Sequence, residues 1–127
     1  MKTDRELLEL AEAWAKSQEI EGDRSESEWE PIFALHSLVA HPETLWRFIV
    51  IAEPICTSAT AFGMLGTGPL EDLIAEYGEA FIGRLELLAK QNPRFAELFQ
   101  HVWIDAGEDP LTLRYLALGC VAVGPPA

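Results

Sequence analysis

Residues 65–78 read LGTGPLEDLIAEYG, and this stretch shows how the chain starts its helices. Gly66 and Gly68 come before a proline and two acidic residues. Proline is favoured at the first position of a helix, and carboxylates in the first turn interact favourably with the helix dipole. The apolar residues that follow recur at helical spacing; they are Leu70, Leu73, Ile74 and Tyr77. The stretch predicts a turn that Gly66 and Gly68 make possible, and then a helix with Gly68 as its cap and Pro69 as its first residue.

A glycine-rich turn before a helix is also typical of phosphate-binding loops. The Walker pattern ends in Gly-Lys-Ser/Thr, because the lysine neutralises the phosphates and the hydroxyl holds magnesium. Here Pro69 lacks an N–H donor, and Glu71 and Asp72 would repel a phosphate. We therefore expect no bound nucleotide or other cofactor. Glu71 and Asp72 are instead candidates for contact with a basic partner.

Similar start signals occur on the N-terminal side of this stretch. Thr3 precedes Glu6 by three residues, which is capping-box spacing, and it predicts a helix over residues 4–18. Ser27 precedes Glu30 by the same spacing and predicts a second helix, ending near residue 41. The apolar face expected for this second helix consists of Trp29, Ile32, Phe33, His36 and Ala40. The four tryptophans are interpreted first as core residues, whereas an exposed tryptophan would indicate a binding surface; they are Trp14, Trp29, Trp46 and Trp103.

Proline and glycine also divide the rest of the chain. Residues 43–53 are apolar nearly all round, which is typical of a buried helix. Gly78 is expected to weaken or divide its helix, and Asn-Pro at 92–93 and Asp-Pro at 109–110 each start a new one. These signals predict an all-α fold of six to eight short helices in antiparallel hairpins, forming a compact bundle or a short helical stack. A β-like run, CVAV, occurs only in the apolar tail, residues 119–127. We interpret residues 1–127 as a single domain.

Acidic residues outnumber basic residues 21 to 9, and the net charge is −12. Such a chain is repelled by nucleic acid and by anionic lipid, so neither is an expected direct partner. Residues 1–30 hold ten of the acids against four bases. Six of these acids crowd into and just beyond an expected loop at residues 19–28: Glu19, Glu21, Asp23, Glu26, Glu28 and Glu30. They form either a solvated surface or an anionic patch that attracts a basic protein.

The cysteines and the charged N-terminus indicate the cellular compartment in which the protein is expected. Cys56 and Cys120 do not make a disulfide framework, and the first residues lack the apolar core of a secretory signal. The apolar run at residues 48–52 is too short to span a bilayer. We therefore expect a cytoplasmic protein with two reduced thiols, and for Cys56 a buried structural role.

Candidates for catalysis and metal binding are few. His36 and His41 are five residues apart, which does not suit two ligands on one helical face. His36 is expected in the core or at its boundary, and we predict neither a metal site nor a catalytic residue. An alternative is a small enzyme or ligand-binding domain that uses His101, Asp105 and Cys56. A further alternative is a homo-oligomeric structural protein, a homodimer joined through the apolar tail.

Residues 45–103 resemble a family of uncharacterised bacterial domains of unknown function. The motifs that carry the resemblance are LWRF at 45–48, LGTGPLEDLI at 65–74, NPRF at 92–95 and VW at 102–103. Gly78, Phe81, Ile82 and Arg84 also belong to it. The resemblance implies a small helical domain and assigns no activity and no catalytic residue.

Charge and size together predict a protein-binding module. A small acidic protein suits a basic partner, as in immunity proteins and in inhibitors of nucleic-acid-binding or phage-defence proteins. The residues expected to contact that partner are the six acids of the N-terminal segment together with Glu71 and Asp72.

Overall fold

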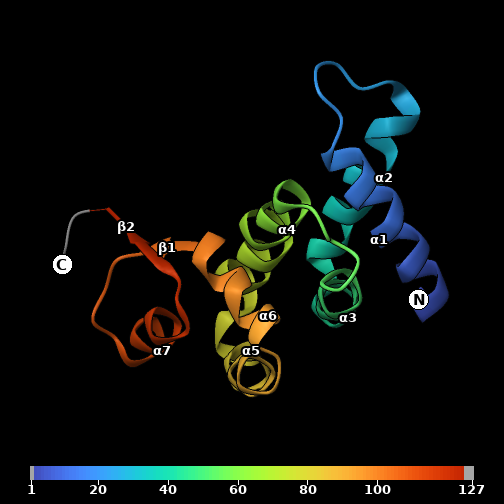
Figure 1. The fold of residues 1–127 in the computed structure, drawn as a ribbon. Coiled ribbons are helices and arrows are strands. Elements are labelled where there is room, and N and C mark those ends of the chain that lie inside the picture. The colour runs from blue at the N-terminus through green and yellow to red at the C-terminus, as the bar shows by residue number, and fades with distance from the viewer. Residues whose placement is uncertain (1, 125–127) are drawn as a thin grey trace. The chain divides into compact units, whose positions relative to one another are not determined.

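The computed structural model describes residues 2–124 and shows a predominantly helical chain (Figure 1). The α-helices are α1 (Asp4–Gln18), α2 (Glu26–His36), α3 (Pro42–Ala52), α4 (Ala59–Leu65), α5 (Glu71–Gln91), α6 (Pro93–Glu97) and α7 (Pro110–Leu118). Shorter segments are the 3-10 helices η1 (Ser37–Ala40) and η3 (Leu98–His101) and the π-helical η2 (Gly66–Leu70). Two three-residue strands, β1 (Trp103–Asp105) and β2 (Val121–Val123), form a small sheet. The predicted all-α class is confirmed, with this sheet as an addition.

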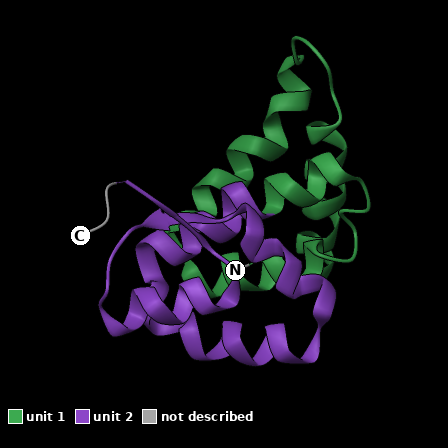
Figure 2. Cartoon of the chain, turned by 60° about the vertical axis from the view of Figure 1, so that its left-hand side comes forward, with its two compact units in different colours: residues 1–65 green, residues 66–127 purple. Residues whose placement is uncertain are grey.

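The chain forms two compact units, residues 1–65 and 66–127 (Figure 2). Each unit has its own helices and its own buried apolar side chains. The interpretation of residues 1–127 as a single domain stays a prediction.

In the first unit, α1 contacts α2, α3 and α4. The side chains of α1 and α3 fill most of this core; the fully or almost fully buried ones are Leu7, Ala11, Trp14, Leu45, Phe48 and Ile49. The Trp14 ring meets the Phe48 ring edge-on, with 6.0 Å between their centroids. The Thr3–Glu6 capping box is present, so the start of α1 is confirmed as the sequence predicts it. Helix α3 is buried along one side, and Val50 on it is exposed.

The start of α2 differs from the prediction. The capping box is formed by Ser25 and Glu28, two residues before the expected pair Ser27 and Glu30. Both pairs have the same spacing, but the Ser17 hydroxyl donates a hydrogen bond to the Glu28 carbonyl oxygen at 2.8 Å and ties this first turn to α1. The loop therefore ends at residue 25, and the acids at 26, 28 and 30 lie on a helix.

The face of α2 that was expected to be buried is largely exposed. Phe33 is 66% exposed and Trp29 38%, and their rings stack at 5.7 Å. His36 is also exposed, so the prediction that it lies in the core or at its boundary is wrong. The buried residues of α2 are Pro31 and Leu35. The stacked pair hides part of each ring from water without reaching the core.

In the second unit, α5 contacts α6 and α7. Its core is built from Leu73, Phe81, Leu85, Phe95, Leu98, Phe99 and Val102. The predicted caps are confirmed: the Asn92 side chain accepts hydrogen bonds from the amides of the next turn, and Asp109 accepts one from Thr112. Gly119 ends α7 with φ +118°, which a residue with a side chain rarely adopts.

The glycine-rich stretch is helical and not a turn, which corrects the prediction made for it. Residues 66–70 form a π-helical segment directly between α4 and α5, and Pro69 lies inside it. Neither Gly66 nor Gly68 has a positive φ. A Cβ at residue 66 would lie 2.6 Å from the carbonyl oxygen of Leu98 and 2.8 Å from Cβ of His101. Gly66 is therefore needed because η3 packs directly against its backbone.

Gly78 marks a kink in α5, as predicted. Tyr77 leaves the helical conformation, with φ −134° and ψ 22°. The buried hydroxyl of Tyr115 on α7 donates a hydrogen bond of 2.5 Å to the Gly78 carbonyl oxygen. A Cβ at residue 78 would meet the Tyr115 ring at 3.3 Å. The kink and the missing side chain together let α7 dock on α5.

The strands β1 and β2 pair in parallel, with Trp103 opposite Val121 and Asp105 opposite Val123. The predicted β-like run in the tail is thus a strand, and its partner was not predicted. Residues 125–127 of the apolar tail lie outside the described residues.

We predict that Gly66→Ala lowers the free energy of unfolding by about 2 kcal/mol, because its methyl group would meet backbone and not a flexible side chain. The matched control is Gly83→Ala on α5, where nothing lies within 4 Å of the new Cβ. This control should raise the stability by about 0.5–1 kcal/mol through helix propensity. Chemical denaturation of both variants checks the pair; equal effects would contradict the proposed close approach.

We also predict that Tyr115→Phe destabilises the protein by about 1–3 kcal/mol, because a buried carbonyl oxygen loses its donor. The ring would stay in place, so the helical circular-dichroism signal should not change before unfolding. Thermal denaturation measures the effect. A melting temperature equal to that of the wild type would show that the Gly78 carbonyl finds another partner.

Candidate functional site

The second unit contains a groove of ≈ 400 Å³ beside the short sheet. Three elements contribute to it: the first turn of α5, strand β1 and the first half of α7. Its lining residues are Glu71, Asp72, Ile74, Ala75, Trp103, Ile104, Asp105, Leu111, Thr112 and Tyr115. Three of these are carboxylates and none is a cation.

Trp103 is the most exposed large side chain of this groove. It is 61% exposed, although its neighbour Val102 is completely buried. Val102 precedes β1 and already has an extended backbone, and in extended backbone successive side chains point to opposite faces. Tryptophan combines a large apolar area with a ring face that attracts cations. The interpretation of Trp103 as a core residue is therefore wrong, and Trp29 is likewise exposed.

The carboxylates of the groove have different roles. Glu71 accepts a hydrogen bond of 2.6 Å from the Trp103 amide, so it fixes the start of β1 to the start of α5. Asp105 is exposed at the end of β1, and Asp72 is half-buried next to Glu71. The structure thus places the predicted pair Glu71 and Asp72 in one groove with Asp105. In the sequence, Asp105 was a candidate only within the alternative enzyme hypothesis, together with His101 and Cys56.

The acids of the N-terminal segment are not equivalent either. Glu19 accepts a hydrogen bond from the Ser58 hydroxyl, and Glu28 closes the cap of α2. The hydrogen bond from the Ser25 amide is the main cause that lowers the pKa of Glu28. The other four are exposed: Glu21, Asp23, Glu26 and Glu30. Arg24 lies among them, but it is tied to the Ser17 carbonyl oxygen and stacks over Trp29.

The groups of the alternative enzyme hypothesis do not form one described site. His101 packs beside Gly66, and its carbonyl oxygen accepts a hydrogen bond from Thr67. Asp105 lines the groove, whereas Cys56 is buried in the first unit. The enzyme hypothesis stays a prediction without a described centre.

Both cysteines are thiols outside any disulfide; Cys56 is buried, as expected, and Cys120 is buried as well. Burial raises the pKa of the Cys120 thiol to about 12, so this thiol is protonated and a weak nucleophile at neutral pH. Among residues 2–124, no three His, Cys, Asp or Glu side chains gather where they could hold a metal ion. Over the same residues, none of the helices combines the length and the apolar character needed to cross a membrane.

Comparison with known proteins gives the family and no activity. The sequence pattern of a family of unknown function, DUF6869, matches residues 16–119. Searches of curated proteins and of solved structures found no match. The match extends on both sides of residues 45–103, over which a resemblance to such a family was predicted. Since it covers most of the sequence, the chain belongs to DUF6869, a family of unknown function.

Proposed function

We propose that this protein is a small acidic module that binds a basic partner protein. The observation that carries the proposal is the groove in which exposed Trp103 lies with Glu71, Asp72 and Asp105. The class of partner is that expected from the charge: a protein whose basic surface binds nucleic acid, which this module would engage or inhibit.

A lysine or arginine side chain suits this groove on two grounds. Its charged end would be attracted by Asp72 and Asp105, and its stem or guanidinium plane would lie on the face of Trp103. Ile104 and Leu111 supply apolar surface for the stem. A cation held by both an aromatic face and carboxylates gains more than at an exposed carboxylate alone, because exposed ion pairs contribute little.

The four exposed acids of the N-terminal segment would contribute mainly to association. They are Glu21, Asp23, Glu26 and Glu30. Long-range attraction of a basic surface raises the association rate and weakens as salt screens it. The groove would then supply the short-range contacts that set the lifetime of the complex.

We predict that Trp103→Ala weakens binding of the basic partner by about 2 kcal/mol or more, as a buried aromatic contact would. Asp105→Asn should weaken it less. The measurement is affinity capture from native cells, with nuclease present and at low and high salt, followed by biolayer interferometry with the captured protein. A basic partner should be captured at low salt and released at high salt.

The matched control is Leu87→Ala on α5, where an exposed apolar side chain outside the groove is truncated. This variant should capture the same partner with unchanged affinity. The proposal is wrong if both variants behave alike, or if none of the salt-sensitive captured proteins is basic.

Charge reversal of the exposed acids tests whether they act on the association rate of the complex and not on its lifetime. Changing Glu21, Asp23, Glu26 and Glu30 to lysine should lower the association rate about tenfold or more at low salt and leave the dissociation rate nearly unchanged. Glu28 is kept, because it caps α2. Stopped-flow kinetics at two salt concentrations measures both rates. An unchanged association rate would identify these acids as a solvated surface only.

A further inference from the structure

Strand β1 has β2 along one edge only. The Val102 carbonyl oxygen, just before β1, accepts a hydrogen bond of 2.8 Å from the Val121 amide, and the Ala106 amide, just after β1, donates one to β2. The backbone groups of successive residues in a strand point alternately to its two edges. The backbone groups of Trp103 and Asp105 therefore point away from β2.

This outer edge of β1 faces the groove. The evidence is Glu71, whose carboxylate lines the groove and accepts the hydrogen bond from the Trp103 amide. The Trp103 carbonyl oxygen and the Asp105 amide follow along the same edge. Among residues 2–124, neither of these two groups has a hydrogen-bond partner. An edge with unpaired amide and carbonyl groups is a template for pairing with another extended chain.

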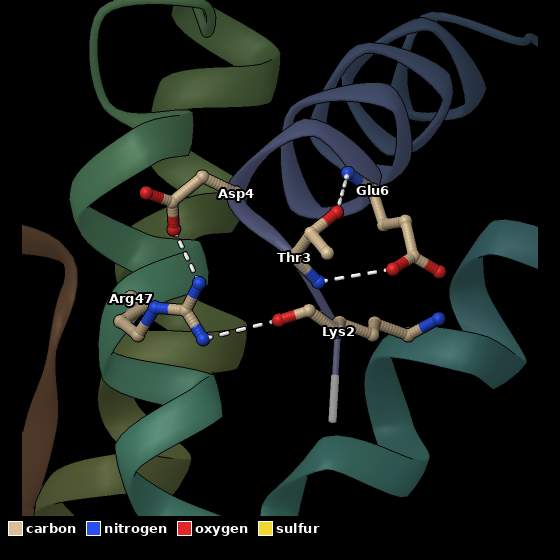
Figure 3. A network of polar contacts seen from close by, with 5 residues as sticks. All are labelled: Lys2, Thr3, Asp4, Glu6 and Arg47. Atoms are coloured by element: carbon tan, nitrogen blue, oxygen red, sulfur yellow. Dashed lines mark hydrogen bonds and ion pairs between the residues drawn. The ribbon is translucent and has the colours of Figure 1, made fainter.

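The charge of the groove favours a basic chain at this edge. The lining residues include three carboxylates and no cation, and Asp105 makes no ion pair with any residue that the structure describes. Acids near the N-terminus differ in this respect. Figure 3 shows Asp4 paired with Arg47, and Glu6 accepting a hydrogen bond from the Thr3 amide. A partner cation would therefore gain more at Asp105 than at acids that already have a partner.

We propose that an extended basic segment of the partner protein binds in the groove as a third strand, parallel to β1. This inference rests on the proposed function and adds how the main chain of the partner is held. One partner residue opposite Ile104 would donate its N–H to the Trp103 carbonyl oxygen and accept a hydrogen bond from the Asp105 amide. Antiparallel pairing along the whole strand would also need the Trp103 amide, which Glu71 already binds.

The register also gives the side-chain pattern of the bound segment. Side chains alternate between the two faces of a sheet, and residues opposite each other share a face. The residue opposite Ile104 should therefore be apolar, because Ile104 belongs to the apolar lining of the groove. Its two neighbours would lie beside Trp103 and Asp105. Arginine suits the first, where it can stack on the ring, and lysine or arginine suits the second. The expected pattern is basic, apolar, basic.

A short blocked peptide, acetyl-Thr-Arg-Val-Lys-Thr-amide, is the probe. One derivative carries an N-methyl group on the valine, which removes the N–H meant for the Trp103 carbonyl oxygen. The matched control carries the methyl group on the lysine, whose N–H would point away from β1. Titration of the full chain, followed by amide chemical shifts, should show the methylvaline peptide binding at least about tenfold more weakly than the control, because a hydrogen bond is lost and the carbonyl stays unpaired.

Hydrogen exchange at single amides gives a second measurement. Saturating peptide should slow exchange of the Asp105 amide about tenfold, because this amide gains a hydrogen bond. The Trp103 amide, already bonded to Glu71, is the internal control and should change much less. The variant Asp105→Asn should weaken peptide binding severalfold. The matched variant Glu12→Gln removes an equal charge from the exposed face of α1 and should leave binding unchanged.

Each contrary outcome has a separate meaning. Equal binding of the two methylated peptides would overturn the inference and leave the proposed function intact, because side chains alone would then hold the segment. If acetyl-Thr-Gln-Val-Gln-Thr-amide binds as tightly as the basic peptide, the proposed function fails as well. A basic peptide that shifts no resonance of β1 also overturns the inference, and the Trp103→Ala measurement still decides the proposed function. Protection of the Asp105 amide that rises with protein concentration alone would identify a second copy of this chain as the occupant and overturn it too.

Discussion

The second unit depends on the direct contact between the backbone of Gly66 and the segment η3. The Leu98 carbonyl oxygen and the His101 side chain occupy the space that any larger residue at 66 would need. This contact fixes where η3 ends, and β1 begins only two residues later. The Trp103 amide then donates a hydrogen bond to Glu71 at the start of α5. The geometry of the groove therefore depends on Gly66, although Gly66 is not one of its lining residues. We therefore expect a substitution at residue 66 to change the position of Trp103.

Much of the helical framework could be predicted from the sequence, because capping is a local interaction. Thr3, Asn92 and Asp109 each act through amides only two or three residues away. The failures occurred where distant contacts decided the outcome. Ser25 and Ser27 both have the spacing of a capping box, and in the structure α2 begins after Ser25. The hydrogen bond from Ser17 to the first turn of α2 is a distant contact that is present with this start. The π-helical segment likewise depends on packing against η3, which lies about thirty residues away.

The candidate groove was predictable only in part, for the same reason. Glu71 and Asp72 were found because acids in a first helical turn are recognisable locally. Trp103 and Asp105 join them because β1 pairs with β2, and a three-residue parallel pairing leaves little signal in either strand. The WID run does contain β-branched and aromatic residues, which favour strands. That signal was missed because the preceding residues fit a helical face.

The net charge suggests more acidic surface than a partner could bind, because several carboxylates already interact within the fold. Glu6, Glu28 and Asp109 cap helices, and Glu86 pairs with Arg114 on α7. Hydrogen bonds to these carboxylates lower their pKa values, so each stabilises the fold in its charged form: the contribution is present at neutral pH and is lost as the pH falls through the lowered pKa. A basic partner would compete for such groups only by weakening the helices that they hold. The acids available to a partner are therefore those without an internal role. Of the 21 acids in the sequence, this argument selects Asp105 and the exposed acids of residues 21–30 as the partner-binding candidates.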